Sequence, residues 1–312
     1  MPEFLKDWLK QQPYWSLALL LGTALVAAPF VTVTKDFYFS TQTPTSYLLV
    51  TIGVSLILLS IASFSISMVT SRAPTSGGLD LSSVEEREGV FSTRVSGCEI
   101  RVWGGRLEDC ELSATGAIVL PVNEYFDDIC AHDAKSALGG FVTKVFPGQA
   151  TEFIELMTAE CRARLGEPKP QQKTADASCP SFGPGRCLLI MKPLGRPIPT
   201  ALVSTTTQRA GQGHSARISY LFDAIRDLVS QLADARINEA VMPVLGSGHG
   251  GLAQPLAFVG MLLAIAEAAR YGQGAQRLKR VGIVVFKPEK NGAWKVDPVT
   301  VKRGLALVGS SG

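Results

Sequence analysis

Charged residues are scarce in this chain of 312 residues. They make up 18% of the sequence, below the ~25% that is usual for soluble domains, and the formal net charge is only +3. So small a charge does not favour a nucleic-acid-binding protein. The 46% of hydrophobic residues excludes a disordered or collagen-like chain. This composition does not fit an ordinary soluble enzyme unless the apolar residues are concentrated in one part of the chain.

Several common functional motifs are also absent. The six cysteines form no Cys-x-x-Cys pair, and together with only three histidines they offer no zinc-binding spacing. The Gly-Lys-Ser/Thr signature of the P-loop of nucleoside triphosphatases does not occur. We also find no internal repeat and no cleavable signal peptide. We therefore expect no metal site and no cofactor, and we expect free thiols in a reducing cytoplasm.

The apolar residues are concentrated near the start of the chain. No charged residue occurs from Gln11 to Thr34 or from Phe37 to Ser71. Within these runs, residues 14–33 and 47–69 each reach the ~20 residues that a helix needs to cross a bilayer. The sequence therefore predicts two transmembrane spans. The alternative is a pair of buried helices in a soluble domain.

The two spans form a predicted helical hairpin over residues 13–70, which follows an amphipathic segment over residues 1–12. Lys6 and Lys10 precede the first span and Arg72 follows the second, whereas the turn between the spans carries a single lysine. The positive-inside rule therefore favours both chain termini on the cytoplasmic side.

The composition changes after the hairpin. Residues 71–89 are rich in Ser, Thr, Gly, Pro and acidic residues and are predicted to be a linker. Residues 90–312 have the length of one further domain. A stretch rich in Pro, Gly and Lys, Gly166–Arg186, is predicted to be an inserted loop or a binding flap.

Strands and helices alternate in the predicted domain. Short apolar runs predict strands at Glu99–Trp103, Ala117–Val122, Cys187–Lys192, Ala201–Thr206, Glu239–Val244 and Arg280–Phe286. Helical patterns occur at Thr151–Arg164, Ser215–Ala235 and Pro255–Tyr271. This alternation predicts an α/β fold with a mixed or parallel sheet sandwiched by helices.

The most informative motif is a glycine-rich segment between the predicted strand at Glu239–Val244 and the predicted helix at Pro255–Tyr271. Glycines permit positive φ, so that successive N–H groups can converge on a phosphate with the help of the helix N-terminus. The spacing also satisfies Gly-x-Gly-x-x-Gly, so a dinucleotide-binding Rossmann half and a purely structural turn are the alternatives. The candidate ligand-binding residues of this segment are Gly246, Ser247, Gly248, His249, Gly250 and Gly251.

A second candidate site follows the predicted strand at Ala117–Val122. Asn123 comes at its end, and a cluster that contains Glu124, Asp127 and Asp128 follows. Ligands bind at strand ends in open α/β sheets. The alternatives are a turn-forming role for the asparagine and a helix N-terminal role for the two aspartates. The small-residue loop that comes next adds the candidates Gly139, Gly140 and Phe141.

In this order, the segments resemble those of macro domains, which bind ADP-ribose. The resemblance covers about Val90 to Phe286 and implies a three-layer α/β/α domain. It also implies that Asn123 faces the distal ribose and that the two glycine segments surround the diphosphate. Where the family usually has Asn-Ala-Ala-Asn, this chain has Leu120-Pro-Val-Asn123. An aspartate is usual near the position of Arg106, so adenine recognition is left open.

Two predicted spans joined to such a domain resemble the effector of type II Thoeris antiphage systems. In that family a TIR-domain enzyme cleaves NAD and makes an ADP-ribose conjugate of histidine, which the macro domain senses. The resemblance implies a non-enzymatic protein of the bacterial inner membrane that forms homo-oligomers on ligand binding and damages the membrane. It implies, as partners, the nucleotide signal, membrane lipid and further copies of the chain. Glu124, Asp127 and Asp128 would pair with the ammonium and imidazole groups of the histidine.

Two other functions are compatible with the same residues. A membrane-anchored ADP-ribosyl hydrolase needs a positioned water and a base near the distal ribose, for which Asn123, Asp127 and His132 are the candidates. A passive ADP-ribose-binding module would show neither turnover nor membrane damage. Ligand turnover and dye leakage from liposomes distinguish the three functions.

Overall fold

The structure is a computed structural model that describes residues 80–127, 131–211, 213–288 and 292–309. The predicted amphipathic segment, both predicted spans (14–33 and 47–69) and most of the predicted linker lie outside these residues. Within the described ranges, no helix is both long and apolar enough to cross a membrane.

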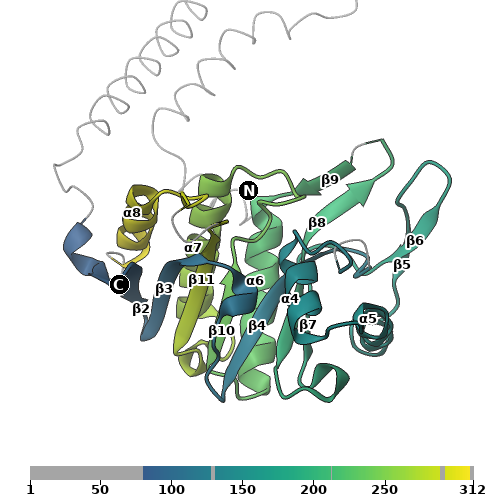
Figure 1. The fold of residues 1–312 in the computed structure, drawn as a ribbon, viewed down its shortest axis with the longest axis horizontal. Helices are drawn as coiled ribbons and strands as arrows, with labels where there is room; N and C mark the ends of the chain where they lie inside the picture. Colours follow the sequence, from purple (N-terminus) through teal and green to yellow (C-terminus); the bar gives the residue numbers. More distant parts are fainter. Residues whose placement is uncertain (1–79, 128–130, 212, 289–291, 310–312) are drawn as a thin grey trace, which may run out of the picture. The chain divides into compact units, whose positions relative to one another are not determined.

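A mixed sheet of nine strands forms the centre of the described domain (Figure 1). Its strand order is β1-β2-β3-β11-β10-β4-β8-β7, and β9 pairs with β8. The five neighbouring strands from β3 to β8 run parallel, whereas β1, β2, β7 and β9 each run antiparallel to the strand beside them. The strands are β1 (Glu85–Arg87), β2 (Val90–Val95), β3 (Cys98–Gly105), β4 (Gly116–Asn123), β7 (Cys187–Ile190), β8 (Thr200–Arg209), β9 (Gly213–Ala216), β10 (Glu239–Pro243) and β11 (Arg280–Phe286).

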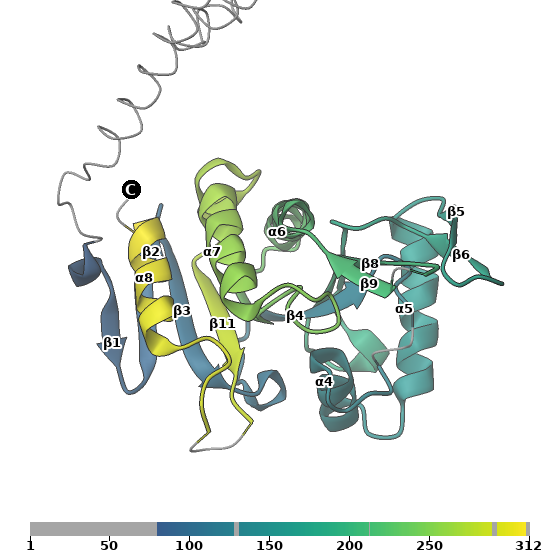
Figure 2. The same cartoon turned by 90° about the horizontal axis from the view of Figure 1, so that it is seen from above.

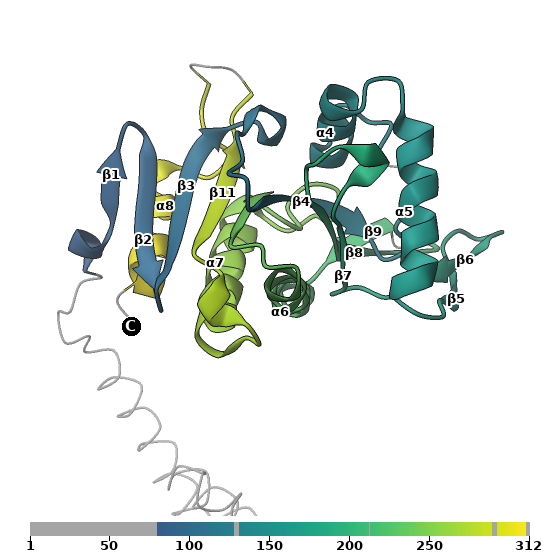
Figure 3. The same ribbon diagram turned by 90° about the horizontal axis from the view of Figure 1, so that it is seen from below.

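Helices cover both faces of this sheet. Views from above and below place α6, α7 and α8 on one face and α4 and α5 on the other (Figures 2 and 3). The domain therefore has the predicted α/β architecture with a mixed sheet between helical layers. The helices are α4 (Ala137–Val145), α5 (Ala150–Arg164), α6 (Ile218–Asp234), α7 (Gln254–Tyr271) and α8 (Pro298–Gly309), and the short 3-10 turns are η1 (Leu81–Ser83), η2 (Leu107–Asp109), η3 (Pro193–Gly195) and η4 (Ala275–Arg277).

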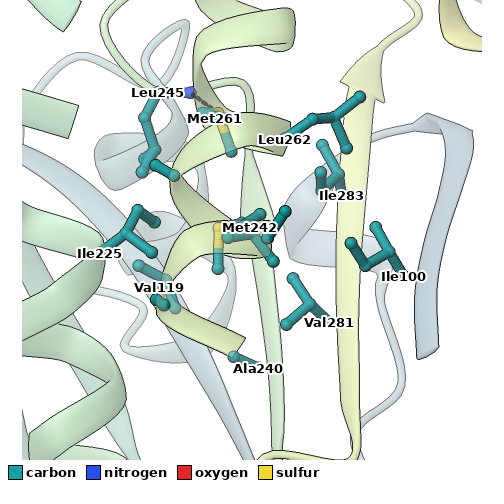
Figure 4. Close-up of a cluster of buried hydrophobic side chains, with 14 of the residues drawn as sticks. Ile100, Val119, Ile225, Ala240, Met242, Leu245, Met261, Leu262, Val281 and Ile283 are labelled. Atoms are coloured by element: carbon teal, nitrogen blue, oxygen red, sulfur yellow. Dashed lines mark hydrogen bonds between the residues drawn. The ribbon is translucent and has the colours of Figure 1, made fainter. Parts of the chain in front are cut away.

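The sheet separates two hydrophobic cores. Side chains alternate between the faces of a strand, so Val119 of β4 packs toward α6 and α7 while Ile118 and Leu120 pack toward α4 and α5. The larger core lies under α6 and α7, where Met261 accepts a 2.9 Å hydrogen bond from the Leu245 backbone (Figure 4). Because both faces are buried, the central strands appear in the sequence as continuous apolar runs.

All six predicted strands are present, and β11 has the predicted bounds. The predicted helix at Ser215–Ala235 is wrong at its start, because Ser215 and Ala216 belong to β9 and Arg217 is extended. The segment with Gly139 and Gly140, interpreted as a loop, is the first part of α4. Ser136 caps this helix by accepting a hydrogen bond from the Gly139 N–H, and the two glycines are buried.

Two further segments differ from their predicted form. The segment Gly166–Arg186 contains an antiparallel hairpin of β5 (Lys169–Gln172) and β6 (Ser178–Ser181), so it is an ordered insertion. The last part of the predicted linker contains η1 and β1, and β1 pairs with β2. The domain therefore starts before the predicted boundary at Val90.

Candidate functional site

A cavity of about 530 Å³ opens at the carboxyl ends of the parallel strands. Strand ends contribute Gly105 of β3, Asn123 of β4, Thr206 of β8, Pro243 of β10 and Phe286 of β11. This edge of an open α/β sheet is the usual place for a ligand site. Three connections contribute most of the other lining residues, and β9 and α7 add His214 and Gln254. The connections are Arg106–Glu108 after β3, Asp133–Leu138 before and within α4, and Gly246–Gly250 between β10 and α7.

The glycine loop between β10 and α7 forms one wall of the cavity. Gly246 has a φ of +75°, and a Cβ on Gly250 would lie 2.7 Å from Ala216, Thr206 and the Gly246 carbonyl, so only glycine fits there. The Ala216 N–H donates a 2.9 Å hydrogen bond to the Gly250 carbonyl, which holds the loop against β9. The N–H groups of Ser247, Gly248 and Gly250 have no acceptor in the described part of the chain. Such a set of backbone donors is suited to an anion.

The N-terminus of α4 forms the wall beside Asn123. The N–H groups of Ala137 and Leu138, in its first turn, have no acceptor among the described residues, as is normal at a helix start. The positive end of the helix dipole therefore lies at the cavity. The Gly140 Cβ position would be 3.2 Å from the Glu108 carboxylate, so this glycine allows α4 to lie close to the connection after β3.

Three buried side-chain atoms that line the cavity have no hydrogen-bond partner within the described ranges. They are the Thr205 hydroxyl, Nδ1 of His214 and Oε1 of Gln254. The pKa of His214 is lowered mainly by burial and next by its neighbour His249, whose ring centroid lies 6.0 Å away. A buried polar atom without a partner is costly, so these atoms are suited to a polar ligand.

Charged side chains also line the cavity. Arg106 Nε donates a 2.7 Å hydrogen bond to Glu108, so the arginine that replaces the aspartate of the resemblance is paired with a nearby acid. Asp133 accepts a hydrogen bond from the Lys135 N–H in the turn before α4. The carboxylate near the end of β3 is therefore that of Glu108, which follows Gly105 and Arg106 in the sequence.

Asn123 is 5% exposed and lines the cavity, but most of its side chain is used internally. Its carbonyl accepts a hydrogen bond from the Tyr125 N–H, and its amide donates a 2.8 Å hydrogen bond to Asp127. The other Asp127 oxygen forms an ion pair with Lys173, which follows β5 in the hairpin. One amide N–H of Asn123 is left for a ligand.

Glu124 is buried beneath the hairpin, with 1% of its surface exposed. It forms an ion pair with Arg209 and accepts hydrogen bonds from the Ser181 hydroxyl at 2.8 Å and the Gln208 N–H at 3.1 Å. The hydrogen bond to Glu124 raises the pKa of Arg209. These contacts join the end of β4 to β6 and β8, and they engage both oxygens of the Glu124 carboxylate.

The structure brings part of the predicted site together. The predicted residues that line the cavity are Asn123, Gly246, Ser247, Gly248, His249 and Gly250. The predicted residues outside its lining are Glu124, Asp127, Gly139, Gly140, Phe141 and Gly251. Asp128 lies outside the described residues. Their roles in ligand binding stay predictions.

Sequence reasoning missed the lining residues that only the sheet order brings together. Thr205, His214 and Gln254 belong to β8, β9 and α7, and no local motif marks them. Ser136 carried a weak signal, because a serine before an apolar segment is a common helix cap.

The fold and this cavity define an α/β domain with a site at the carboxyl edge of its sheet. Among solved structures, the domain is similar to macrodomains. A mutant Oceanobacillus iheyensis macrodomain with ADPR is 10% identical, with a TM-score of 0.48 and coverage of 71% of this chain and 97% of that chain. The macrodomain of Thermus aquaticus DarG is 19% identical (TM-score 0.38; 61% and 98% covered), and the Trypanosoma brucei macrodomain in complex with ADP is 16% identical (TM-score 0.41; 66% and 68% covered). No protein-family model and no curated protein matches the chain.

Proposed function

We propose that the described domain binds ADP-ribose or a derivative of it in the cavity at the carboxyl edge of the sheet. The observation that carries this proposal is the set of unpaired backbone donors on Ser247, Gly248 and Gly250, which line the cavity. Closely spaced N–H groups in a glycine loop before a helix are suited to a diphosphate.

The rest of the cavity supports a sugar-containing ligand. Its volume of about 530 Å³ lies within the range of ~300–1,000 Å³ that is typical of small-molecule sites. Thr205, His214 and Gln254 offer unpartnered acceptors and a hydroxyl, which match the hydroxyl groups of a ribose. The diphosphate would lie against the glycine loop and the α4 N-terminus.

The chain as a whole is, in this proposal, a membrane-anchored effector of Thoeris-type antiphage immunity in the bacterial inner membrane. The support is the pair of uncharged runs at residues 14–33 and 47–69, joined to a nucleotide-binding domain. The signal would be a histidine conjugate of ADP-ribose, made by a TIR-domain enzyme. Binding promotes homo-oligomerisation and membrane damage only if the ligand binds the assembled state more tightly than the resting state.

The domain acts in this proposal as a sensor and not as an enzyme. Hydrolysis would need a base beside the distal ribose. Asp127 is instead engaged by Asn123 and Lys173, and His132 is exposed and outside the described cavity lining. These contacts favour binding over turnover.

The decisive variant is Thr205→Val, which removes an unpartnered buried hydroxyl with little change of shape. We expect it to lower ADP-ribose affinity about fivefold to tenfold in calorimetry of the full-length protein, because one ligand hydrogen bond is lost. Its melting temperature should be unchanged or higher, since no internal hydrogen bond is lost. Thr207→Val, outside the cavity lining, is the control. Equal affinities for wild type and Thr205→Val would count against this cavity as the site.

The effector role needs a separate experiment. Full-length protein in liposomes is incubated with the products of a TIR-domain enzyme, and dye leakage and retained nucleotide are measured. Leakage that occurs only with ligand supports the effector. Ligand turnover would support a hydrolase, and binding without either would leave a passive module.

A further inference from the structure

A second cavity, of about 450 Å³, opens at the opposite edge of the sheet. It lies where the chain enters β10 and β11, at their amino ends, whereas the first cavity lies at their carboxyl ends. The rise of the strands separates the two by roughly 15–25 Å. Its lining residues are Arg236, Ile237, Asn238, Gln276, Arg277 and Lys279.

The lining of this cavity is composed almost entirely of hydrogen-bond donors. Arg236 and Lys279 have no acidic partner in the described part of the chain. The Thr115 hydroxyl donates a 2.7 Å hydrogen bond to Oδ1 of Asn238, which leaves the Asn238 amide N–H groups without an acceptor among the described residues. Two guanidinium groups, an ammonium and an amide therefore face one space.

The acids at this edge of the sheet are already engaged by other arginines. Glu99 forms ion pairs with Arg101 at 2.9 Å and Arg280 at 3.2 Å, and Glu239 pairs with Arg280 at 3.5 Å. Because those carboxylates are neutralised elsewhere, the charge of the three basic residues that line the cavity is not balanced within the described domain.

An arginine occupies position 236, where the backbone conformation favours glycine. Two hydrogen bonds, from the Arg236 N–H to Ala233 and from the Ile237 N–H to Leu232, close the end of α6 in a Schellman motif. The residue at this position takes a left-handed conformation, here with a φ of +58°, and is usually glycine. An observed strained residue of this kind is a reason to look for a function.

The neighbouring arginine is held in place by the turn that contains η4. Arg277 Nη1 donates a 2.7 Å hydrogen bond to the Ala233 carbonyl at the end of α6. Gly274, with a φ of +75°, allows this close approach, because a Cβ there would lie 2.2 Å from that of Ala233. The guanidinium is therefore preorganised beside Arg236, at the negative end of the α6 dipole.

We propose that this cavity is a second, separate site that binds an anion carrying phosphate or diphosphate. Arg236, Arg277 and Lys279 supply the charge, Asn238 supplies an amide donor, and the buried Ile237 is the apolar residue of the lining. The ligand is a soluble phosphorylated molecule or the phosphate of a lipid headgroup, which share this chemistry.

The test measures the binding of inorganic pyrophosphate to the full-length protein by calorimetry. Arg236→Gly should lower the affinity about tenfold and at the same time raise the melting temperature by about 2–4 °C, because glycine relieves the left-handed backbone. If Arg236 served only to stabilise the fold, Arg236→Gly would lower the melting temperature instead. Lys279→Gln should lower the affinity about fivefold, and added salt should weaken binding in wild type.

Two controls locate the anion. Arg196→Gln removes an equal charge from an exposed turn, so it should not change pyrophosphate affinity. A second titration is made in saturating ADP-ribose, which occupies the first cavity, and the binding that depends on Arg236 and Lys279 should persist there. A short-chain phosphatidylglycerol is titrated in parallel to distinguish a lipid headgroup from a soluble anion. If only the lipid binds, and its affinity depends on Arg236 and Lys279 in the same way, the site binds phosphate and its ligand is a lipid headgroup. Binding of neither probe, or affinities unchanged in both variants, overturns the proposal.

Discussion

The side-chain amide of Asn123 donates a 2.8 Å hydrogen bond to Asp127, and the other oxygen of Asp127 pairs with Lys173. A residue that lines the cavity is thus oriented by an acid that the β5–β6 hairpin holds in place. Lys173 also lies 5.2 Å from the centre of the Tyr125 ring, which fixes the lysine against the end of β4. The inserted hairpin is therefore connected to the candidate site through side chains.

Lys173→Met tests this connection. The substitution keeps the apolar stem over Tyr125 but removes the charge, so Asp127 no longer holds Asn123 in one orientation. We expect ADP-ribose affinity to fall about twofold to tenfold. Lys169→Met, exposed on the same hairpin, is the matched control. If Asp127 instead binds a cationic group of the ligand directly, as the resemblance to the Thoeris effectors implies, the loss of Lys173 would free it and affinity for a histidine conjugate would rise.

Glu124 should matter for stability, because its carboxylate is buried and satisfied by internal partners. Glu124→Ala removes the acceptor of the Arg209 ion pair and of two hydrogen bonds, so the Ser181 hydroxyl and the Gln208 N–H lose the carboxylate to which they donate. We expect a loss of about 2–4 kcal/mol in the free energy of unfolding, measured by urea denaturation. Glu167→Ala, on the exposed segment before β5, should change it by less than about 0.5 kcal/mol. A stable Glu124→Ala protein with weakened ligand binding would instead favour the ligand-contact role.

The central strands were predictable because they are buried on both faces. A run such as Val281–Val285 has no polar residue that would suggest an exposed edge, and β11 has the predicted bounds. The start of α4 was not predictable in this way. Gly139 and Gly140 lower helix propensity, but Ser136 caps the helix and tertiary packing against Glu108 favours small residues there.

The candidate site was predictable only where it is local in sequence. The glycine loop from Gly246 to Gly250 carries its own signal, because glycines clustered between a strand and a helix are typical of a backbone that approaches a ligand closely. The pairing of Glu124 with Arg209 joins residues 85 positions apart, and composition alone cannot separate such a buried acid from a ligand-binding one. The sheet order that puts β10 between β4 and β11 likewise has no local signature.

The glycine loop offers a matched pair of substitutions. A methyl group on Gly250 would lie 2.7 Å from three neighbours, whereas one on Gly248 would meet no atom within 4 Å. We expect Gly250→Ala to cost about 1–3 kcal/mol in unfolding free energy and to weaken ADP-ribose binding, since the loop must move. Gly248→Ala should leave stability unchanged within about 0.5 kcal/mol. Equal melting temperatures for the two variants would contradict the described loop.

The buried thiols should be unreactive in the folded protein. Burial raises the pKa of Cys98 and of Cys161 to about 12, and it raises that of Cys187 well above its ordinary value. At pH 8 only about one in ten thousand of the first two thiols would be ionised, and the thiolate is the reactive form. We expect mass spectrometry to show slow alkylation of these three cysteines in the native state and rapid alkylation in urea. Rapid native labelling of Cys161 would mean that α5 does not pack on the sheet as described.

His214 should make the stability of the domain depend on pH. Burial, followed by the neighbouring His249, lowers its pKa below the ordinary value of 6.5, with Lys173 acting in the same direction and Asp127 in the opposite one. As the pH falls below about 6.5, the unfolded chain takes up the proton before the folded protein does. The contribution of His214 to the free energy of unfolding is therefore fully present above that pH. It is lost as the pH falls from 6.5 through the lower pKa of the folded state.

The measurement is the urea midpoint from pH 8 to pH 5 for wild type and for His214→Asn. We expect the two profiles to run parallel above pH 7 and the wild-type midpoint to fall more steeply below pH 6.5, because the variant lacks the titrating ring. His249→Asn should reduce the steepness, since a neighbour that disfavours protonation has been removed. Parallel profiles throughout, or a wild-type midpoint that rises relative to that of His214→Asn as the pH falls, would show that the imidazole is not held in its neutral form at the cavity.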